Sequence, residues 1–379
     1  MKNNRVLVTG GAGFIGGRLS IMLIEKGYTV TVLDNLSPQI HGEDYEESPL
    51  YKSVKDKVKF IHGDVRNKSD WEDALVNQDF IIHLAAETGT GQSMYEIEKY
   101  TSVNVSGTAI MLDLLQNKKH EIRKIIIASS RAIYGEGKYF CEQHGVIYPF
   151  QRTQECMSHG DFNIKCPHCN SNAKELPTSE DSAINSLSIY ALTKHMQENM
   201  CIMIGKAINI PVVSLRYQNV YGPGQSLTNP YTGILSIFST RIKNGNDINI
   251  FEDGKESRDF IYIDDVVDAT ILALENNAAN YECFNVGSGK PVSVFEVATT
   301  LKVKYNSTIN IHISGNYRVG DIRHNYADLS KIKKMLGFLP KYEFNDGATK
   351  FVDWVNSQNI TEDKYEKSIE ELKSKGLYK

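Results

Sequence analysis

Residues Val6–Gly16 read VLVTGGAGFIG, and this stretch decides the fold of the chain. A short apolar strand runs into Gly10, Gly13 and Gly16, and a helix-like segment follows them. Glycines at this spacing permit a tight turn, close approach of the backbone to a pyrophosphate and close packing of helix on strand. The free N–H groups at the start of the helix would face the anion. The stretch therefore predicts the first unit of a dinucleotide-binding sheet.

The alternation of strands and helices continues well beyond this unit. Short apolar runs each precede a longer amphipathic stretch, which is typical of a parallel sheet covered by helices on both faces. Right-handed crossovers make this a doubly wound α/β (Rossmann) fold. The expected strands are 5–9, 29–34, 59–62, 80–84, 124–129 and 212–216, and the expected helices are 14–26, 69–76, 103–116 and 188–206.

Changes in composition divide the chain further. Residues 1–216 are expected to form the dinucleotide-binding domain, and 217–379 a smaller α/β substrate lobe with some segments returning to the first domain. Residues 137–177 lack periodicity and are rich in Cys, His, Pro and Asn, which indicates an insertion. The polar segment 37–56 reads as a surface loop, and the charged segment 361–379 as a solvated helix or frayed end.

Composition excludes several classes of protein. The 379 residues carry 42 basic and 46 acidic side chains, for a net charge of −4, which argues against nucleic acid as a partner. With 41% hydrophobic and 23% charged residues the chain resembles an ordinary globular protein. It has no apolar run of membrane-spanning length and no signal-peptide core, so no membrane and a cytoplasmic location are expected.

An acidic residue ends the second expected strand and bears on the choice of dinucleotide. Asp34 would accept hydrogen bonds from a ribose diol and repel a 2′-phosphate, and no Arg or Lys follows at once. NAD is therefore favoured over NADP. Asp64, after the third strand, either contacts the adenine or serves as a simple turn carboxylate.

Three residues form the expected catalytic group. Tyr190 and Lys194, in YALTK, stand four residues apart and share one helix face. A tyrosine normally titrates near pH 10, so a nearby ammonium and a positive nicotinamide would be needed to favour its phenolate. Ser130 ends the fifth strand, where doubly wound sheets place groups that contact ligands, although a strand-end cap is the simpler interpretation.

These motifs together resemble a known family. TGGAGFIG, HLAA (83–86), SSRAIYG (129–135), YALTK, LRYQNVYGP (215–223) and RDFIYIDD (258–265) follow the order seen in the extended short-chain dehydrogenase/reductase family, and more narrowly in its nucleotide-sugar epimerases and dehydratases. The resemblance implies bound NAD, a homodimer formed through helices 103–116 and 188–206, and Ser130, Tyr190 and Lys194 as catalytic residues. The residues implied to bind NAD are Gly10, Gly13, Phe14, Ile15, Gly16, Asp34, Asn35, Asp64, Val65, Leu84, Ala85, Ala86, Thr88, Asn104 (supporting the lysine through water), Ser129, Tyr190, Lys194, Tyr217 and Val220.

The motif after the catalytic serine separates two activities within the family. The family's 4,6-dehydratases carry an Asp-Glu pair there, which supplies acid and base for loss of water, whereas this chain has Arg131 and Ala132. Neither can fill that role at neutral pH. A 4-epimerase needs only hydride removal, rotation of the ketose and hydride return. A net NAD(P)-dependent reductase or dehydratase, another nucleotide-sugar epimerase, and a non-catalytic NAD-binding scaffold are the alternatives, and the scaffold would be expected to lose one of the three catalytic residues.

Longer stretches narrow the implied substrate. SRAIYGEGKY, LSIYALTKHMQE and RYQNVYGPGQSLTNPYTGILSIFSTRI resemble the branch of the family that acts on dTDP-6-deoxyhexoses such as dTDP-L-rhamnose. Arg258 and Arg318 match positions that contact phosphates, although surface salt bridges would be the simpler interpretation of each. The residues implied to bind the substrate are Thr88, Gln92, Ser130, Arg131, Tyr190, Asn219, Phe251, Arg258 and Arg318.

The insertion carries a pattern of its own. Cys141-x-x-His144 is followed by Cys166-x-x-Cys169, and such spacings resemble a structural zinc site. Reduced thiols in a hydrogen-bonded loop, or a knuckle that docks another macromolecule, would produce the same pattern. The choice of ligands also stays open, because further Cys and His residues lie within reach: Cys156, His159 and His168.

Overall fold

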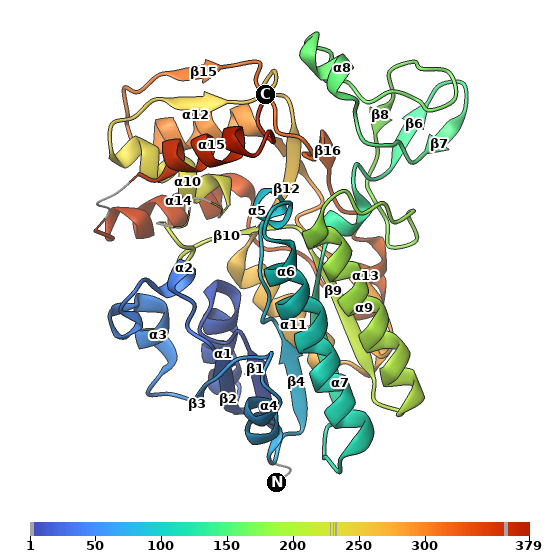
Figure 1. Cartoon of the computed structure of the whole chain (residues 1–379), viewed down its shortest axis with the longest axis vertical. Coiled ribbons are helices and arrows are strands. Elements are labelled where there is room, and N and C mark those ends of the chain that lie inside the picture. The colour runs from blue at the N-terminus through green and yellow to red at the C-terminus, as the bar shows by residue number, and fades with distance from the viewer. Residues whose placement is uncertain (1–3, 228, 230, 232, 360–362) are drawn as a thin grey trace.

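A seven-stranded parallel sheet forms the centre of the molecule in the computed structural model, which describes residues 4–227, 229, 231, 233–359 and 363–379 (Figure 1). The strand order is β13-β9-β5-β4-β1-β2-β3, so the chain reverses direction across the sheet beside β1. The prediction of a doubly wound α/β fold is confirmed. The strands are β1 (Arg5–Thr9), β2 (Thr29–Asp34), β3 (Lys59–His62), β4 (Phe80–His83), β5 (Lys124–Ser130), β9 (Val212–Tyr217) and β13 (Cys283–Val286).

Alternate side chains of each strand supply two separate cores. Val6 and Val8 of β1 join the core on one face, and Leu7 joins the core on the other. Helices α1 (Phe14–Glu25) and α11 (Ile263–Glu275) cover the first face. Helices α4 (Lys68–Leu75), α7 (Gly107–Asn117) and α9 (Ile189–Ala207) cover the second. Since both faces are buried, the strands need the near-continuous apolar runs seen in the sequence.

Two segments of the first domain differ from the sequence-based expectation. The expected helix 103–116 begins as a π-helical turn, η2 (Thr101–Ser106), before α7. Segment 37–56 is not a loop, because prolines at the first helical positions start short helices and Val54 packs into a small core. That segment holds α2 (Pro38–His41), η1 (Tyr45–Glu47) and α3 (Pro49–Val54).

The C-terminal lobe lies over the carboxyl ends of the central strands (Figure 1). One sheet joins β10 (Asn219–Tyr221), β12 (Ser257–Tyr262), β14 (Pro291–Ser293) and β16 (His324–Asn325), and a second pairs β11 (Ile248–Ile250) with β15 (Ile311–Ile313). The helices after β10, apart from α11, are α10 (Ile234–Lys243), η4 (Asn277–Ala279), α12 (Val294–Lys304), α13 (Ser330–Leu336), α14 (Phe344–Asn356) and α15 (Tyr365–Ser374). Within the described ranges, no helix combines the length and apolar character needed to cross a membrane.

The final segment of the chain is packed rather than frayed. Ile369 and Leu372 of α15 and the following Tyr378 are buried together, with Phe251 against them. The expectation of a solvated end for 361–379 is therefore wrong for residues 363–379, because α15 has an apolar face that covers the C-terminal lobe. Residues 361 and 362 of that expectation lie outside the described residues.

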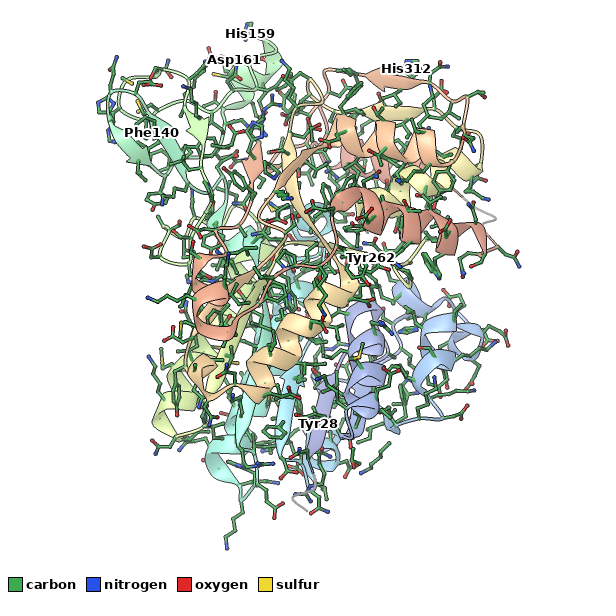
Figure 2. All side chains as sticks on the ribbon, turned by 180° about the vertical axis from the view of Figure 1, so that it is seen from behind. Tyr28, Phe140, His159, Asp161, Tyr262 and His312 are labelled. Carbon is green, nitrogen blue, oxygen red and sulfur yellow. The ribbon has the colours of Figure 1, made fainter. Side chains whose placement is uncertain are left out.

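The Cys-rich segment projects from the body of the molecule, beside the C-terminal lobe (Figure 1; Phe140, His159 and Asp161 mark it in Figure 2). It contains a three-stranded sheet and one short helix: β6 (Tyr139–Cys141), β7 (Gly145–Ile147), β8 (Lys174–Glu175) and α8 (Gln154–Ser158). We call residues 137–177 the insert.

One buried arginine ties the insert to the C-terminal lobe. Arg152 donates from Nη1 to Glu252 Oε2 at 2.8 Å and from Nη2 to the Asp321 carbonyl at 2.9 Å. Its Nη1 also lies 3.4 Å from the carbonyl oxygen of Phe162 within the insert. Because Arg152 and Glu252 are both buried, this ion pair fixes the insert against its neighbour.

Candidate active site

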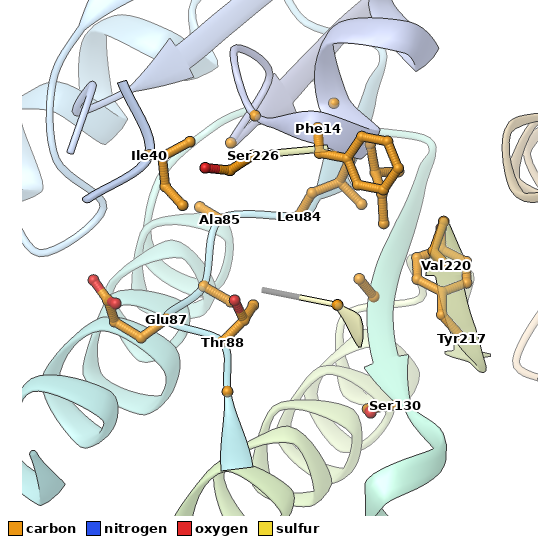
Figure 3. Close-up of a pocket in the computed structure, with 18 of the residues that line it drawn as sticks. Phe14, Ile40, Leu84, Ala85, Glu87, Thr88, Ser130, Tyr217, Val220 and Ser226 are labelled. Atoms are coloured by element: carbon orange, nitrogen blue, oxygen red, sulfur yellow. The ribbon is translucent and has the colours of Figure 1, made fainter. Parts of the chain in front are cut away.

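A cavity of about 470 Å³ opens at the carboxyl ends of the central strands, between the sheet and the C-terminal lobe (Figure 3). This is where doubly wound sheets bind ligands. The cavity brings together most of the predicted dinucleotide residues, namely Gly10, Gly13, Phe14, Ile15, Gly16, Asp34, Asn35, Val65, Leu84, Ala85, Ala86, Thr88, Ser129, Tyr190, Lys194, Tyr217 and Val220. Ser130, Arg131 and Asn219, predicted to contact the substrate, line it too.

The glycine turn between β1 and α1 has no room for side chains. Gly10 has a φ of +68°, and a Cβ there would stand 2.8 Å from the backbone nitrogen of Ala85. A Cβ on Gly16 would stand 2.1 Å from the carbonyl oxygen of Gly10. No side chain caps the start of α1, so its first N–H groups remain available to an anion in the cavity.

Asp34 holds the loop that follows it and also lines the cavity. Its carboxylate accepts hydrogen bonds from the backbone N–H groups of Ala12 and Leu36, each at 2.9 Å. Each carboxylate oxygen keeps a further lone pair for a ribose hydroxyl. The neighbouring His41 ring is buried, which lowers its pKa, so the ring brings no positive charge that would attract a 2′-phosphate.

Asp64 and Asn104 lie outside the cavity lining. The Asp64 carboxylate accepts from the Arg66 guanidinium at 2.8 Å and from Asn35 at 3.2 Å, which favours the turn-carboxylate interpretation over an adenine contact. Asn104, in η2, bonds both backbone groups of Glu87 and the hydroxyl of Thr193. Asn104 therefore fastens the loop after β4 to α9, at the residue that directly precedes Lys194.

The three predicted catalytic residues meet at one point of the cavity. Ser130 ends β5, and its hydroxyl neighbours the Tyr190 hydroxyl. Lys194, one helical turn beyond Tyr190, is buried and donates from Nζ to the carbonyl oxygen of Ala128 at 3.0 Å. The Ser188 side chain caps the start of α9 by accepting from the Ala191 N–H at 3.1 Å, which fixes where this helix begins.

The positive charge that acts on the Tyr190 phenol comes from Arg131, whereas the sequence led us to expect an ammonium group. Burial raises the pKa of Tyr190, and the neighbouring Ser130 hydroxyl and then the positive charge of Arg131 oppose that rise. Burial lowers the pKa of Lys194 to about 7, and the nearby Cys201 opposes this fall only in part. Arg131, which the sequence offered as a sugar-pocket residue, is thus the side chain whose charge acts on the phenol.

Two arginines place positive charge beside this group. Arg131 donates from Nε to Asn219 Oδ1 at 3.1 Å. Burial, and then the charge of Arg258, lowers the pKa of Arg131 to about 9. Arg258 itself donates to the backbone carbonyls of Ser257, Ile322 and Arg323 at 2.7–2.9 Å. The two guanidinium groups create a local positive potential suited to a diphosphate.

Four predicted substrate residues do not line the main cavity. Gln92 is buried and hydrogen-bonded to Gln39 and Tyr100. Arg258 donates to backbone carbonyls, as stated above. Arg318 pairs with Asp321 at 2.8 Å and stacks over the ring of Phe251. Arg318 lines a small neighbouring cavity instead, together with residues of α5 (Thr90–Ser93), because α15 packs over this part of the lobe. Helix α6 (Ile97–Tyr100) follows α5.

The cavity also has lining residues that sequence reasoning missed. Glu87 and Gly89 extend the loop after β4, and Gln225, Ser226 and Tyr231 follow the Gly-Pro turn after β10. Glu87 could have been found, since it directly follows HLAA at a strand end. The residues after the turn carry no periodic signal, so only the tertiary structure places them.

A doubly wound sheet, a dinucleotide-type glycine turn and a Ser-Tyr-Lys group define an NAD-dependent enzyme of the short-chain dehydrogenase/reductase type. The family model described as the NAD dependent epimerase/dehydratase family matches residues 6–156 and 167–287, and the chain belongs to this family. The match is interrupted inside the insert. The resemblance stated from the motifs, and the prediction of an enzyme, are confirmed.

Individual relatives span almost the full chain. A dTDP-L-rhamnose 4-epimerase of Burkholderia thailandensis is 36% identical over 355 residues, covering 93% of this chain and 94% of that protein. A putative UDP-glucose 4-epimerase of Methanocaldococcus jannaschii is 30% identical, covering 94% and 100%. Among solved structures, the UDP-glucuronic acid 4-epimerase of Bacillus cereus, in complex with UDP-glucuronic acid and NAD, has a TM-score of 0.76 at 26% identity, covering 93% and 99%.

Proposed function

We propose that the protein is an NAD-dependent nucleotide-sugar 4-epimerase that works through a transient 4-keto sugar. We propose further that its substrate is a dTDP-6-deoxyhexose such as dTDP-L-rhamnose. The observation that carries the activity is that Ser130, Tyr190 and Lys194 line the same cavity as the glycine turn and Asp34. The 36% identity to a dTDP-L-rhamnose 4-epimerase supports the choice of sugar.

The residues around the glycine turn fit NAD. The uncapped start of α1 offers N–H groups to a pyrophosphate, and the Asp34 carboxylate offers acceptors to a ribose diol. When bound, NAD supplies a hydride acceptor and a positively charged nicotinamide ring. Lys194 would hold the ribose beside that ring, since its stem is buried under the same wall of the cavity.

Tyr190 would move the proton. Its phenolate accepts the proton of the sugar 4-hydroxyl, and Ser130 steadies that oxygen with a hydrogen bond. Because burial raises the Tyr190 pKa, the phenolate needs positive charge nearby, and Arg131 provides part of it. After the 4-keto sugar has rotated, the same phenol would return the proton. Because the hydride removed from C4 also goes back to C4, the reaction has no net redox change.

The side chains after Ser130 support epimerisation over dehydration. Arg131 and Ala132 occupy the first positions of η3 (Arg131–Tyr134), directly after the serine. Elimination of water needs an acid and a base beside the sugar, and neither residue can provide them. Glu87 lines the cavity but is ion-paired with Lys99 at 3.3 Å.

The substrate diphosphate is proposed to lie beside Arg131 and Asn219. These two side chains line the cavity, and Arg258 adds charge from behind them. Thr88 would face the sugar. Arg318 and Phe251 are proposed to contact the nucleotide, and Gln92 the sugar. All three also have contacts within the protein.

The test is incubation with a panel of dTDP-, UDP-, GDP- and CDP-sugars, with NMR used to detect inverted centres and without added NAD. We expect dTDP-L-rhamnose to give its C4 epimer with no change in absorbance at the NADH wavelength. Stoichiometric change in that absorbance would indicate a net reductase instead. If only UDP-sugars were epimerised, the proposed 4-epimerase activity would stand and the proposed substrate would be wrong.

A homodimer through α7 and α9 is also proposed. Leu192, Met196 and Met203 of α9 are 45%, 39% and 67% exposed, and their spacing puts them on one helix face. Such a stripe on each of two copies would form a helical bundle. Sedimentation should show a dimer for the native chain, and the Leu192→Glu, Met196→Glu double variant should be monomeric. A native monomer would exclude this assembly.

A further inference from the structure

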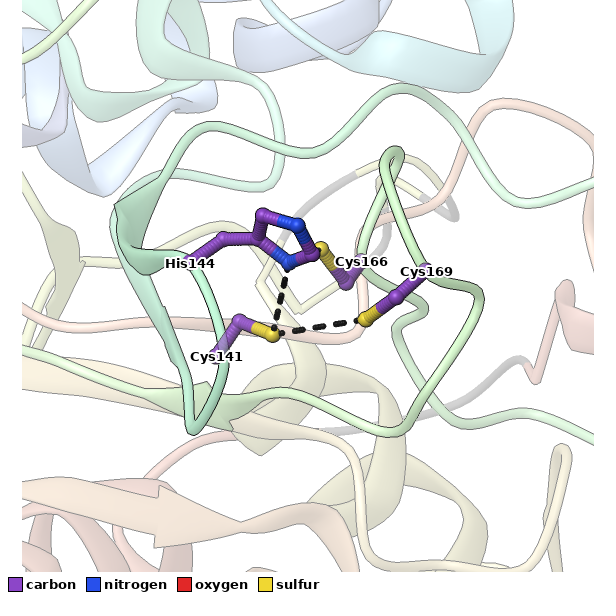
Figure 4. Close-up of side chains that lie close together, drawn as sticks. All are labelled: Cys141, His144, Cys166 and Cys169. Atoms are coloured by element: carbon purple, nitrogen blue, oxygen red, sulfur yellow. Dashed lines mark hydrogen bonds between the residues drawn. The ribbon is translucent and has the colours of Figure 1, made fainter.

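Four side chains of the insert bring three sulfur atoms and one ring nitrogen to a single point. They are Cys141, His144, Cys166 and Cys169, and their four ligand atoms all lie within 4.8 Å of one another (Figure 4). Cys141 Sγ is 3.6 Å from His144 Nδ1 and 3.6 Å from Cys169 Sγ. Cys166 Sγ is also 3.6 Å from His144 Nδ1. The three cysteines are not paired as disulfides.

These separations fit the edges of a zinc tetrahedron. With Zn–S bonds of about 2.3 Å and Zn–N bonds of about 2.0–2.1 Å, tetrahedral angles give S–S edges of about 3.8 Å and S–N edges of about 3.6 Å. A disulfide would bring two sulfur atoms to about 2.05 Å and would leave the histidine without a role. The arrangement is therefore the one that a single central ion requires.

The backbone holds the four ligands in two tight turns. Cys141 and His144 lie on the β6–β7 hairpin, which turns at Gly145 with a φ of +70°. Cys166 and Cys169 lie on a second turn closed by Cys166 N–H to the Ser171 carbonyl at 2.8 Å and Asn170 N–H to the Cys166 carbonyl at 2.9 Å. Each turn contributes two ligands to the same point.

Polar groups behind the ligands support thiolates rather than thiols. The His168 backbone N–H points at Cys166 Sγ with a separation of 3.5 Å. The Ser171 hydroxyl lies 3.0 Å from Cys169 Sγ and 3.7 Å from Cys141 Sγ. Donors placed around coordinating sulfur atoms orient them and compensate for their charge.

The insert also has too little apolar core to hold itself. Its largest buried cluster is Tyr139, Cys141, Ile147, Ile164 and Cys166, and two of these five are themselves members of the site. Small units with so little buried area commonly depend on a metal or on disulfides. The structure also decides among the possible ligands: in the described chain Cys156, His159 and His168 lie outside the group, and the His159 ring bonds the Glu155 carbonyl instead.

We propose that Cys141, His144, Cys166 and Cys169 bind one structural Zn²⁺. All four coordination positions are filled by protein, so the ion has no open position for catalysis. Its role is to hold the two turns together and, through Arg152, to keep the insert seated on the C-terminal lobe. This proposal is independent of the sugar that the enzyme turns over.

The test is zinc content per chain in protein purified without chelators, measured by elemental analysis, on native chain and three variants. Cys169→Ser and His144→Ala remove ligands that are partly or fully exposed, so they disturb the fold less than changes at the buried cysteines. Cys156→Ser is the matched control, because it removes a partly exposed cysteine of the same insert outside the group. X-ray absorption at the zinc edge reports the ligands directly.

We expect about one zinc per native chain and per Cys156→Ser chain, a coordination shell of three sulfur atoms and one nitrogen, and at least a tenfold weaker hold on zinc in the other two variants. Circular dichroism of each variant shows whether it has folded. If a variant does not fold, titration of zinc into the reduced, metal-free native protein tests the site without it. Absence of stoichiometric binding in both preparations would overturn the site, as would equal zinc retention in Cys169→Ser and Cys156→Ser.

Discussion

The central sheet and the insert hold their shapes by different means. The sheet buries an apolar core on each face, with strands such as β9 buried along their whole length. The insert buries one small cluster and closes its turns around four side chains, which are Cys141, His144, Cys166 and Cys169. The difference shows that packing decides the shape of the region carrying the reaction, whereas the projecting region depends on a few side chains meeting at one point.

The largest effect on turnover is expected at the cavity, at the carboxyl ends of the central strands. Tyr190→Phe keeps the ring packing but removes the hydroxyl that would take the substrate proton, so turnover should fall by about 10³-fold while the dinucleotide stays bound. Steady-state kinetics and the NAD content of the purified variant check this. Tyr28→Phe, a half-exposed tyrosine bonded to Glu275 far from the cavity, is the control. If Tyr190→Phe retained full turnover, the assigned base would be wrong.

The next effect tests the packing of the sheet. Ile126 is fully buried in β5, so Ile126→Ala should destabilise the whole protein by about 3 kcal/mol through lost burial and a cavity. Denaturant unfolding, followed by the far-UV signal, measures the change. A loss below about 1 kcal/mol would show that the sheet core does not govern global stability.

A smaller effect concerns charge at the site. Arg131→Met removes a positive charge that lowers the Tyr190 pKa, so that pKa should rise. The phenolate then forms only at higher pH, and the rising limb of kcat/KM against pH should shift upward by about one unit, which is about tenfold in rate at neutral pH. Arg131→Lys, which keeps the charge, is the comparison. If the rising limb of the pH profile did not shift in Arg131→Met, Arg131 would have no influence on the Tyr190 pKa.

The smallest global effect is expected in the insert. Ile164→Ala opens the small cluster beside the four ligands, so the amides of residues 139–147 should exchange hydrogen faster. Global stability should change by less than about 0.5 kcal/mol, in contrast to Ile126→Ala. Hydrogen exchange with mass spectrometry reports both regions at once. Equal destabilisation by the two variants would erase the distinction between sheet and insert.

The sequence allowed most of the sheet to be predicted because its signals are local. Apolar runs give the strands, and the glycine spacing gives the first turn. The strand β13 was not predicted, since Cys283–Val286 follows a long excursion and only tertiary pairing with β9 brings it back. Segment 37–56 was misjudged because its polar composition favoured a loop, whereas Pro38 and Pro49 each stand at a helix start.

The site was predictable only to the extent that its residues stand at strand ends or share a helix face. Ser130, Tyr190 and Lys194 meet as expected, but the influence of Arg131 on Tyr190 depends on burial and on a through-space charge. Arg318 and Phe251 were placed by resemblance, and the packing of α15 over them follows from contacts far apart in sequence. Motif spacing carries no information on such contacts.

The Arg152–Glu252 ion pair restricts the movement of the insert relative to the C-terminal lobe. Moving the insert away from the C-terminal lobe would break the Arg152–Glu252 ion pair and the bond from Arg152 to the Asp321 carbonyl. As long as these contacts hold, a displacement of the C-terminal lobe also displaces the insert.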